Sequence, residues 1–155
     1  MKISISYFYN IRFFKPYQIP ISTAIWDPKW FHNGLGNSEV FIDKNGVING
    51  LRSEELNPRS CHSEGCPCLE KNYESCKFLK DYRLGLKQIS FKNLIEKFET
   101  IAKGWVNMID IKEEPEIVLI VYETPDNPCS ERTAIIDWFL ENGIIVKEWE
   151  KTCYI

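Results

Sequence analysis

Four cysteines near the middle of the chain have a spacing that could hold a metal ion. Cys61, Cys66, Cys68 and Cys76 are separated by four, one and seven residues, and His62 follows the first of them. The stretch 52–76 offers few large apolar side chains, and a compact domain rarely keeps so long a connection unless something orders it. Four thiolates around one zinc ion would supply the missing folding free energy. We expect a structural Zn²⁺ site made by these cysteines, with free thiols as the alternative. His62 either replaces one cysteine as a ligand or contacts the ligands from outside.

A second candidate site lies in the segment from Glu123 to Arg132, between a buried strand and a helix. Cys129, Ser130 and Arg132 are expected in the first turn of that helix, where free N–H groups and the helix dipole attract anions. A thiolate is favoured there, a hydroxyl can donate to an oxyanion, and a guanidinium can bind phosphate through two parallel hydrogen bonds. The pattern predicts Cys129 as a nucleophile and the other two residues as ligand-binding groups.

Each of these residues also has a purely structural interpretation. The Asn-Pro pair at 127–128 is an ordinary N-cap followed by proline at the first helical position. Cys129 could be a small buried apolar residue, as free cysteines usually are. Arg132 opposes the helix dipole unless an anion compensates it, and Glu123 or Asp126 could do so within the protein.

Two further loops are expected at the carboxyl ends of strands, where ligands bind in open parallel sheets. The first contains Tyr9 and Arg12, and the second contains Trp26, Lys29 and Trp30. Aromatic faces can stack on nucleobases without sequence preference, and the cations can contact phosphates. Packing into the core or its rim is the alternative for the two tryptophans. These five residues complete the predicted ligand-binding set.

The hydrophobic pattern predicts the strands that position these loops. Ile3, Ile5 and Tyr7 alternate with polar residues, which indicates a first strand with one buried face. A second strand is expected over 19–26, and the apolar runs around Asn45-Gly46 predict a β-hairpin. Two later strands are expected. The continuous apolar run 117–122 should lie in the centre of the sheet, and a last strand should cover 144–149.

Three helices are expected between and after these strands. The first covers 76–88, and the second begins after Ser90 as N-cap, because apolar residues then follow a 3.6-residue period. The third places Ala134, Ile135, Trp138 and Phe139 on the core and ends at 142–143. The link over residues 10–18 is short for a helical crossover. These elements predict one α/β domain over 1–155 with a mostly parallel sheet and a cysteine-rich insertion at 52–76.

Composition narrows the class of protein. The 155 residues are 44% hydrophobic and 26% charged, with net charge −3, which gives no general attraction to nucleic acid or anionic membranes. The sequence contains no apolar run long enough to cross a bilayer, and its N-terminus does not resemble a secretory signal. We therefore expect a cytoplasmic protein without a membrane partner, in a compartment where clustered cysteines bind metal.

Several short motifs resemble the domain-of-unknown-function family numbered 488. They are the segments 6–12 (SYFYNIR), 20–22 (PIS), 26–30 (WDPKW) and 118–123 (VLIVYE) with Cys129. The resemblance implies a Rossmann-like, three-layer α/β fold, and the insertion with the hairpin is similar to a bacterial and phage subgroup. The family commonly has His-Arg where this chain has Ser130-Glu-Arg132, so a role for that histidine has no counterpart here. No established reaction comes with the resemblance.

Three hypotheses about function follow from these residues. The first is a binding protein that holds a nucleotide or nucleic-acid end at the carboxyl edge of the sheet. The second is a thiol-dependent enzyme on a phosphorylated or nucleotide substrate, with Cys129 as nucleophile, for which only His32 offers a base. The third is a zinc-stabilised module that contacts a protein, such as a host partner. The short supply of acid–base groups favours binding.

Overall fold

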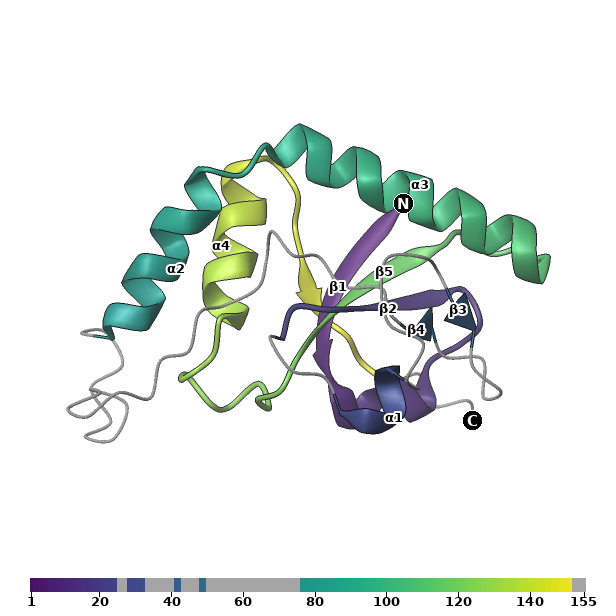
Figure 1. The fold of residues 1–155 in the computed structure, drawn as a ribbon, viewed down its shortest axis with the longest axis horizontal. Helices are drawn as coiled ribbons and strands as arrows, with labels where there is room; N and C mark the ends of the chain where they lie inside the picture. Colours follow the sequence, from purple (N-terminus) through teal and green to yellow (C-terminus); the bar gives the residue numbers. More distant parts are fainter. Residues whose placement is uncertain (25–27, 33–40, 43–47, 50–75, 152–155) are drawn as a thin grey trace.

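The structure is a computed structural model that describes residues 1–24, 28–32, 41–42, 48–49 and 76–151. Its centre is a four-stranded sheet in the order β2-β5-β1-β6, and all strand pairs in it are parallel (Figure 1). The strands are β1 (Lys2–Tyr7), β2 (Gln18–Ser22), β5 (Glu116–Val121) and β6 (Lys147–Glu148). The predicted α/β class with a parallel sheet is confirmed.

The remaining elements include the three predicted helices and the predicted hairpin, together with two short helices, η1 (Phe8–Phe13, a 3-10 helix) and α1 (Lys29–His32), in segments that were predicted as loops. The others are β3 (Phe41–Ile42), β4 (Ile48–Asn49), α2 (Lys77–Lys87), α3 (Phe91–Ile109) and α4 (Arg132–Glu141). β3 and β4 pair antiparallel, which confirms the hairpin, although its turn lies outside the described residues. Numbered along the chain, the four parallel strands stand in the order 2-3-1-4. The dinucleotide-binding order is 3-2-1-4, so a Rossmann-like fold stays a prediction.

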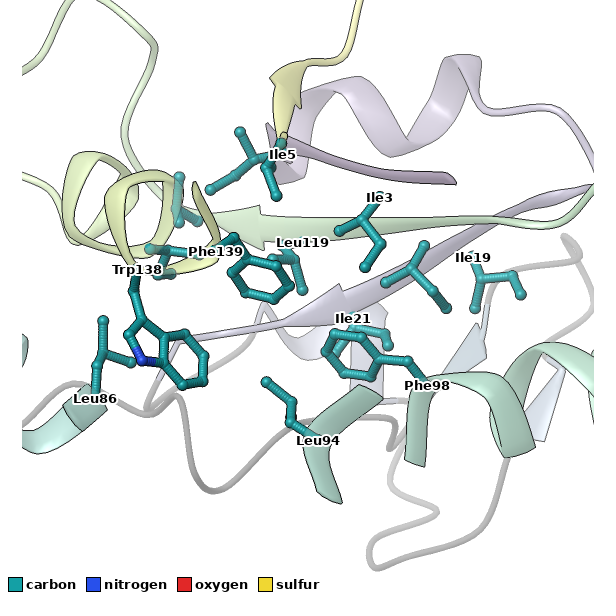
Figure 2. Packing of buried hydrophobic residues seen from close by; sticks show 14 of the residues in the cluster. Ile3, Ile5, Ile19, Ile21, Leu86, Leu94, Phe98, Leu119, Trp138 and Phe139 are labelled. Carbon is teal, nitrogen blue, oxygen red and sulfur yellow. The ribbon is translucent and has the colours of Figure 1, made fainter. Parts of the chain in front are cut away.

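The three long helices cover one face of the sheet. Ser90 caps α3 as predicted, because its Oγ accepts a hydrogen bond from the backbone N–H of Asn93 at 3.3 Å. Gly143 ends α4 with a φ of 84°, a left-handed conformation that favours glycine. Figure 2 shows how the core side chains meet between helices and sheet. This core contains Ile3, Ile5, Ile19, Ile21, Leu86, Leu94, Phe98, Leu119, Trp138 and Phe139.

The opposite face of the sheet is covered by a second, smaller core. Val118 and Ile120 of β5 pack there against an aromatic layer from η1, α1 and the segment after β6. This layer consists of Phe8, Phe31 and Trp149, with Phe13 and Phe14 half-buried beside it. The prediction of a first strand with one buried face is therefore wrong.

The serines of β1 show what this second core does to the strand. Ser4 and Ser6 are each 1% exposed, because the aromatic layer covers the face on which they lie. Ser6 keeps a polar partner, since Asn10 Nδ2 donates a hydrogen bond to its Oγ at 3.0 Å. The alternation of apolar and polar residues correctly indicated which side chains lie on each face of β1. It did not indicate that aromatic residues bury the polar face.

Two strands and one connection differ from the predictions. β2 spans Gln18–Ser22 instead of 19–26, and β6 spans only Lys147–Glu148 of the expected 144–149. The link after β1 contains η1, and it carries the chain past β5 to the sheet edge at β2, not to a neighbouring strand. Pro20 is tolerated in β2 because β2 is the edge of the four-stranded sheet.

A buried polar pair joins two neighbouring strands at their amino ends. Gln18 Nε2 donates to Glu116 Oε2 at 2.7 Å, and Lys2 Nζ lies 3.3 Å from the other oxygen of this carboxylate. Glu116 is 3% exposed, so these contacts compensate for the water that it loses.

Among the described residues, no helix is both long and apolar enough to span a lipid bilayer.

Candidate functional site

The segments that follow β1 and β5 leave the sheet toward opposite faces. β1 and β5 are paired neighbours, from Lys2 opposite Glu116 to Tyr7 opposite Val121. η1, after β1, packs into the small aromatic core, whereas α4, after β5, packs into the large core on the other face. In open α/β sheets, ligands bind where neighbouring strands diverge in this way. The candidate site is therefore the carboxyl edge of the β1–β5 pair.

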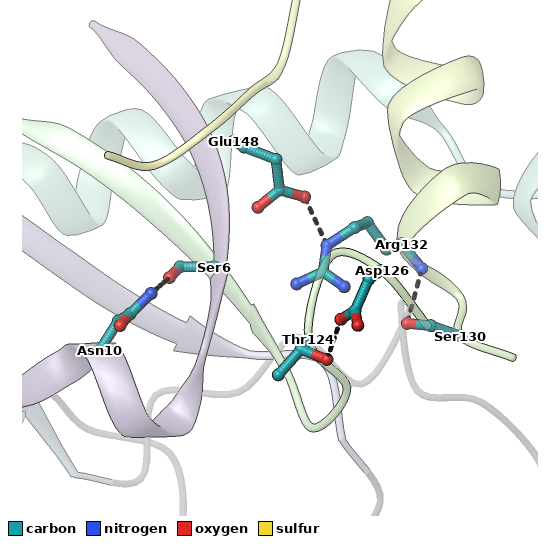
Figure 3. A network of polar contacts seen from close by, with 7 residues as sticks. All are labelled: Ser6, Asn10, Thr124, Asp126, Ser130, Arg132 and Glu148. Atoms are coloured by element: carbon teal, nitrogen blue, oxygen red, sulfur yellow. Dashed lines mark hydrogen bonds and ion pairs between the residues drawn. The ribbon is translucent and has the colours of Figure 1, made fainter. Parts of the chain in front are cut away.

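Arg132, the first residue of α4, lies at this edge and is only 5% exposed. Its Nε atom forms an ion pair with Glu148 Oε1 of β6 at 2.5 Å (Figure 3). The two terminal nitrogens of the guanidinium, Nη1 and Nη2, are also buried and have no hydrogen-bond partner among the described residues. The sequence predicted Glu123 or Asp126 as the compensating carboxylate, and Glu148 takes the direct contact instead.

The turn before α4 differs from the predicted N-cap. The helix begins at Arg132 and not at Pro128, so Cys129 and Ser130 precede its first turn. Asn127 Oδ1 instead accepts a hydrogen bond from the backbone N–H of Cys129 at 2.9 Å, which closes a local turn that competes with the helix. Ser130 Oγ accepts from the backbone N–H of Arg132 at 3.2 Å. The expected helix-dipole effect on the Cys129 thiol therefore loses its basis.

Carboxylates surround the Arg132 side of the site. Asp126 is exposed and accepts a hydrogen bond from Thr124 Oγ1, which is the main reason that its pKa is lowered, with a smaller effect from Arg132. Burial raises the pKa of Glu148, and the contact with Arg132 opposes this shift. The Oε2 atom of Glu123 is buried without a hydrogen-bond partner in the described part of the chain. Unsatisfied donors and an unsatisfied acceptor thus occur at one edge of the sheet.

Glu131 is the most perturbed carboxyl of the site. It is 5% exposed, and burial, followed by repulsion from Glu123, raises its pKa to about 7. Thr23, just after β2, lies with its Oγ1 3.0 Å from Glu131 Oε1 and also 3.0 Å from the carbonyl oxygen of Ile120. A group that exchanges its proton near neutral pH at the carboxyl edge of a sheet is a typical acid–base candidate.

Aromatic rings meet one another beyond the carboxyl ends of three strands. The ring of Phe8 lies 4.7 Å from that of Tyr122 and 5.6 Å from that of Phe31, centroid to centroid. These three residues come from the segments after β1, β5 and β2 respectively. Tyr122 is 49% exposed, so part of its ring remains accessible at the edge.

The predicted residues Tyr9 and Arg12 lie on η1 and are exposed. The Arg12 guanidinium lies over the Tyr9 ring, 4.0 Å from its centroid, and its Nε donates to the Tyr9 carbonyl at 2.9 Å. Lys151 lies over Phe13 in the same manner at 3.9 Å. Tyr9 and Arg12 are thus exposed and pair with each other, whereas Arg132 is buried, so the predicted residues do not share one environment.

Several predicted residues, or their side chains alone, lie outside the described part of the chain. Lys29 is exposed on α1, while Trp26 lies outside the described residues, as do the side chains of Trp30 and His32. Cys61, Cys66 and Cys68 also lie outside them. Cys76 is buried at the N-cap of α2. Within the described ranges no group of three or more His, Cys, Asp or Glu residues could hold a metal ion, so any cysteine site needs ligands from 50–75.

Sequence reasoning missed Thr23, Glu131 and Glu148. Glu131 lies between the predicted ligand-binding residues Ser130 and Arg132. A carboxylate next to an arginine at a strand-to-helix junction is the sequence feature that could have identified it. Glu148 could not be found in this way, because its place depends on β6 pairing with β1, where it stands opposite Ile5.

Comparisons of the chain with protein-family models, curated proteins and solved structures find no match. The resemblance to the family numbered 488 therefore stays a prediction.

Proposed function

We propose that this protein binds a nucleotide, or the nucleotide end of a nucleic acid, at the carboxyl edge of β1 and β5, with Arg132 as the phosphate anchor. The observation that carries the proposal is the buried guanidinium of Arg132: its Nε is paired with Glu148, whereas its terminal Nη1 and Nη2 atoms lack hydrogen-bond partners in the described chain. Buried polar groups in folded proteins are nearly always paired, and leaving one unpaired costs about 1–3 kcal/mol or more for a charged group. A ligand phosphate would remove that cost.

The surrounding carboxylates favour a nucleotide over a bare phosphate ion. Glu123 Oε2 is a buried acceptor without a partner, and Glu148 and Asp126 act electrostatically on Arg132. A phosphate alone would be repelled by these groups. A ligand that carries hydroxyl donors beside its phosphate can satisfy the carboxylate and the guanidinium together. The accessible ring of Tyr122 offers a surface for a base.

Calorimetric titration with adenosine 5′-monophosphate and with inorganic phosphate tests the proposal. We expect the nucleotide to bind more tightly than phosphate, and Arg132→Gln to weaken nucleotide binding at least tenfold, which is about 1.4 kcal/mol. Arg83→Gln is the matched control, because Arg83 forms a half-exposed ion pair with Asp137 between α2 and α4. The double variant R132Q/E148Q keeps the local charge balanced if the single variant does not fold. Equal binding by wild type and a folded Arg132 variant would refute the proposal.

A thiol-dependent enzyme is the second candidate, and one observation favours it. Glu131 supplies a group with a pKa of about 7 two residues after Cys129, where the sequence had offered only His32 as a base. Cys129 is half-buried at the edge of the site. Alkylation at neutral pH decides between the candidates. Fast modification of Cys129, slowed in Glu131→Gln, supports catalysis, and an inert Cys129 with intact ligand binding supports the binding protein.

The zinc site remains part of the proposal as a structural element. A buried thiol at the start of α2 suits a metal ligand, because it would fix the point where the cysteine-rich segment meets the helix. Elemental analysis of freshly purified protein should find about one equivalent of zinc. A markedly smaller amount would leave only the free-thiol interpretation. In that case the zinc-stabilised interaction module would be excluded as well.

A further inference from the structure

The hydroxyl of Thr23 lies between two oxygen atoms but carries one hydrogen. Its Oγ1 is 3.0 Å from the Ile120 carbonyl oxygen and 3.0 Å from Glu131 Oε1. The carbonyl can only accept a hydrogen bond, and it already accepts the backbone N–H of Thr23 at 2.9 Å. The direction of the Thr23 hydroxyl therefore depends on the protonation state of Glu131.

Both protonation states of Glu131 fit this arrangement without movement of heavy atoms. When Glu131 is ionised, Thr23 donates to it, and Ile120 keeps the backbone N–H. When Glu131 is protonated, its own O–H donates to Thr23 Oγ1, and the Thr23 hydroxyl turns to Ile120. The Thr23 hydroxyl, the Ile120 carbonyl oxygen and Glu131 Oε1 each keep a hydrogen bond in either state.

The neighbours of Glu131 have opposing effects on its pKa. Thr23 faces it from the end of β2, Glu123 from the segment after β5, Arg132 from α4, and Tyr82 from α2. Burial and Glu123 favour the neutral carboxyl, while the hydrogen bonds and Arg132 favour the ionised form, so its pKa is about 7. Burial, and next the charge of Glu131, raise the pKa of Tyr82, which therefore stays neutral in this range. Glu148 and Asp126 act on the same Arg132.

We propose that Glu131 takes up a proton when a phosphate-bearing ligand occupies Arg132, so that ligand affinity falls as pH rises above neutrality. This inference rests on the proposed function. A ligand phosphate would place one to two negative charges beside Glu131 and would neutralise the cation that favours its ionised form. Both effects make the ionised carboxyl less favourable. By linkage, a proton that binds with the ligand must also promote ligand binding.

Isothermal titration of adenosine 5′-monophosphate in buffers of different ionisation enthalpy measures the proton uptake directly. Wild type and Glu131→Gln are compared, so that the titration of the phosphate itself cancels. Glutamine can donate to Thr23 Oγ1 and thus imitates the protonated state. Between pH 6 and pH 8 we expect the wild-type affinity to fall roughly five- to tenfold more than that of E131Q. Glu141→Gln, the same change at the exposed end of α4, should behave as wild type.

The outcomes separate the two proposals. Proton uptake in wild type that is lost in E131Q supports the inference. Equal proton uptake and equal pH dependence in both proteins overturn the inference and leave nucleotide binding intact. Absence of binding to wild type and to E131Q over the whole pH range overturns the proposed function, and the inference falls with it.

Discussion

The rings of Phe8 and Tyr122 touch at 4.7 Å between centroids and so connect the segments that follow β1 and β5. Phe8 is 6% exposed and also contacts Phe31 of α1. Phe8 is therefore the ring that joins Tyr122 to the small aromatic core. Tyr122 is half-exposed and contributes its face to the edge.

Replacement of Phe8 by alanine should destabilise the protein strongly. Truncation of a buried phenylalanine typically costs about 3–5 kcal/mol, because it removes buried area and leaves a cavity. Tyr122→Ala should cost about 1–2 kcal/mol, since half of that ring is already in contact with water. Urea denaturation of the three proteins measures the difference. A smaller loss for Phe8→Ala than for Tyr122→Ala would mean that the small core does not depend on Phe8.

Stability should depend on pH through Glu131. Its folded pKa of about 7 exceeds the usual value of 4.5, so the folded state binds more protons between these values. The contribution is fully present below pH 4.5 and is lost as pH rises through 7, with a span of about 3 kcal/mol. Glutamine at this position should remove the slope. Denaturation midpoints of wild type and Glu131→Gln at pH 5 to 8 provide the measurement. The same pH dependence of the midpoint in both proteins would show that folding does not shift the pKa of Glu131.

The buried pair of Gln18 and Glu116 should matter more than the exposed cation beside it. Gln18→Ala removes a 2.7 Å hydrogen bond from a carboxylate that is 3% exposed, and we expect a loss of about 1–3 kcal/mol. Lys2→Gln should cost less than about 1 kcal/mol, because Lys2 is largely in water. Thermal unfolding of both variants at pH 7 tests the ranking. A larger loss of stability for Lys2→Gln than for Gln18→Ala would mean that Lys2 is the main partner that stabilises Glu116.

The exposed side chains of η1 should affect long ligands and spare short ones. Arg12 over Tyr9 and Lys151 over Phe13 place two cations over aromatic rings of η1. Arg12→Ala should leave adenosine monophosphate binding within about twofold but weaken a short single-stranded oligonucleotide severalfold and reduce its salt dependence. Fluorescence anisotropy at two salt concentrations measures both effects. An equal loss for both ligands would place Arg12 inside the mononucleotide site.

Local signals in the sequence predicted the elements better than the site. The Ser90 cap, the apolar run of β5 and the stop at Gly143 are each determined by neighbouring residues, and the structure contains all three. The start of α4 was misplaced because Asn127 bonds to Cys129 in a separate turn. Contacts between distant segments, such as Arg132 with Glu148, depend on strand order, which the pattern of a single sequence does not contain.

The strand order also determines when the protein can fold during its synthesis. β1 and β2 are made first but are not neighbours, since β5 lies between them and pairs with both. A nascent chain that has emerged only as far as α3 therefore has no partner for either strand in the four-stranded sheet. The central sheet can assemble only after Val121 has left the ribosome, and until then the two early strands have unpaired edges that chaperones can bind.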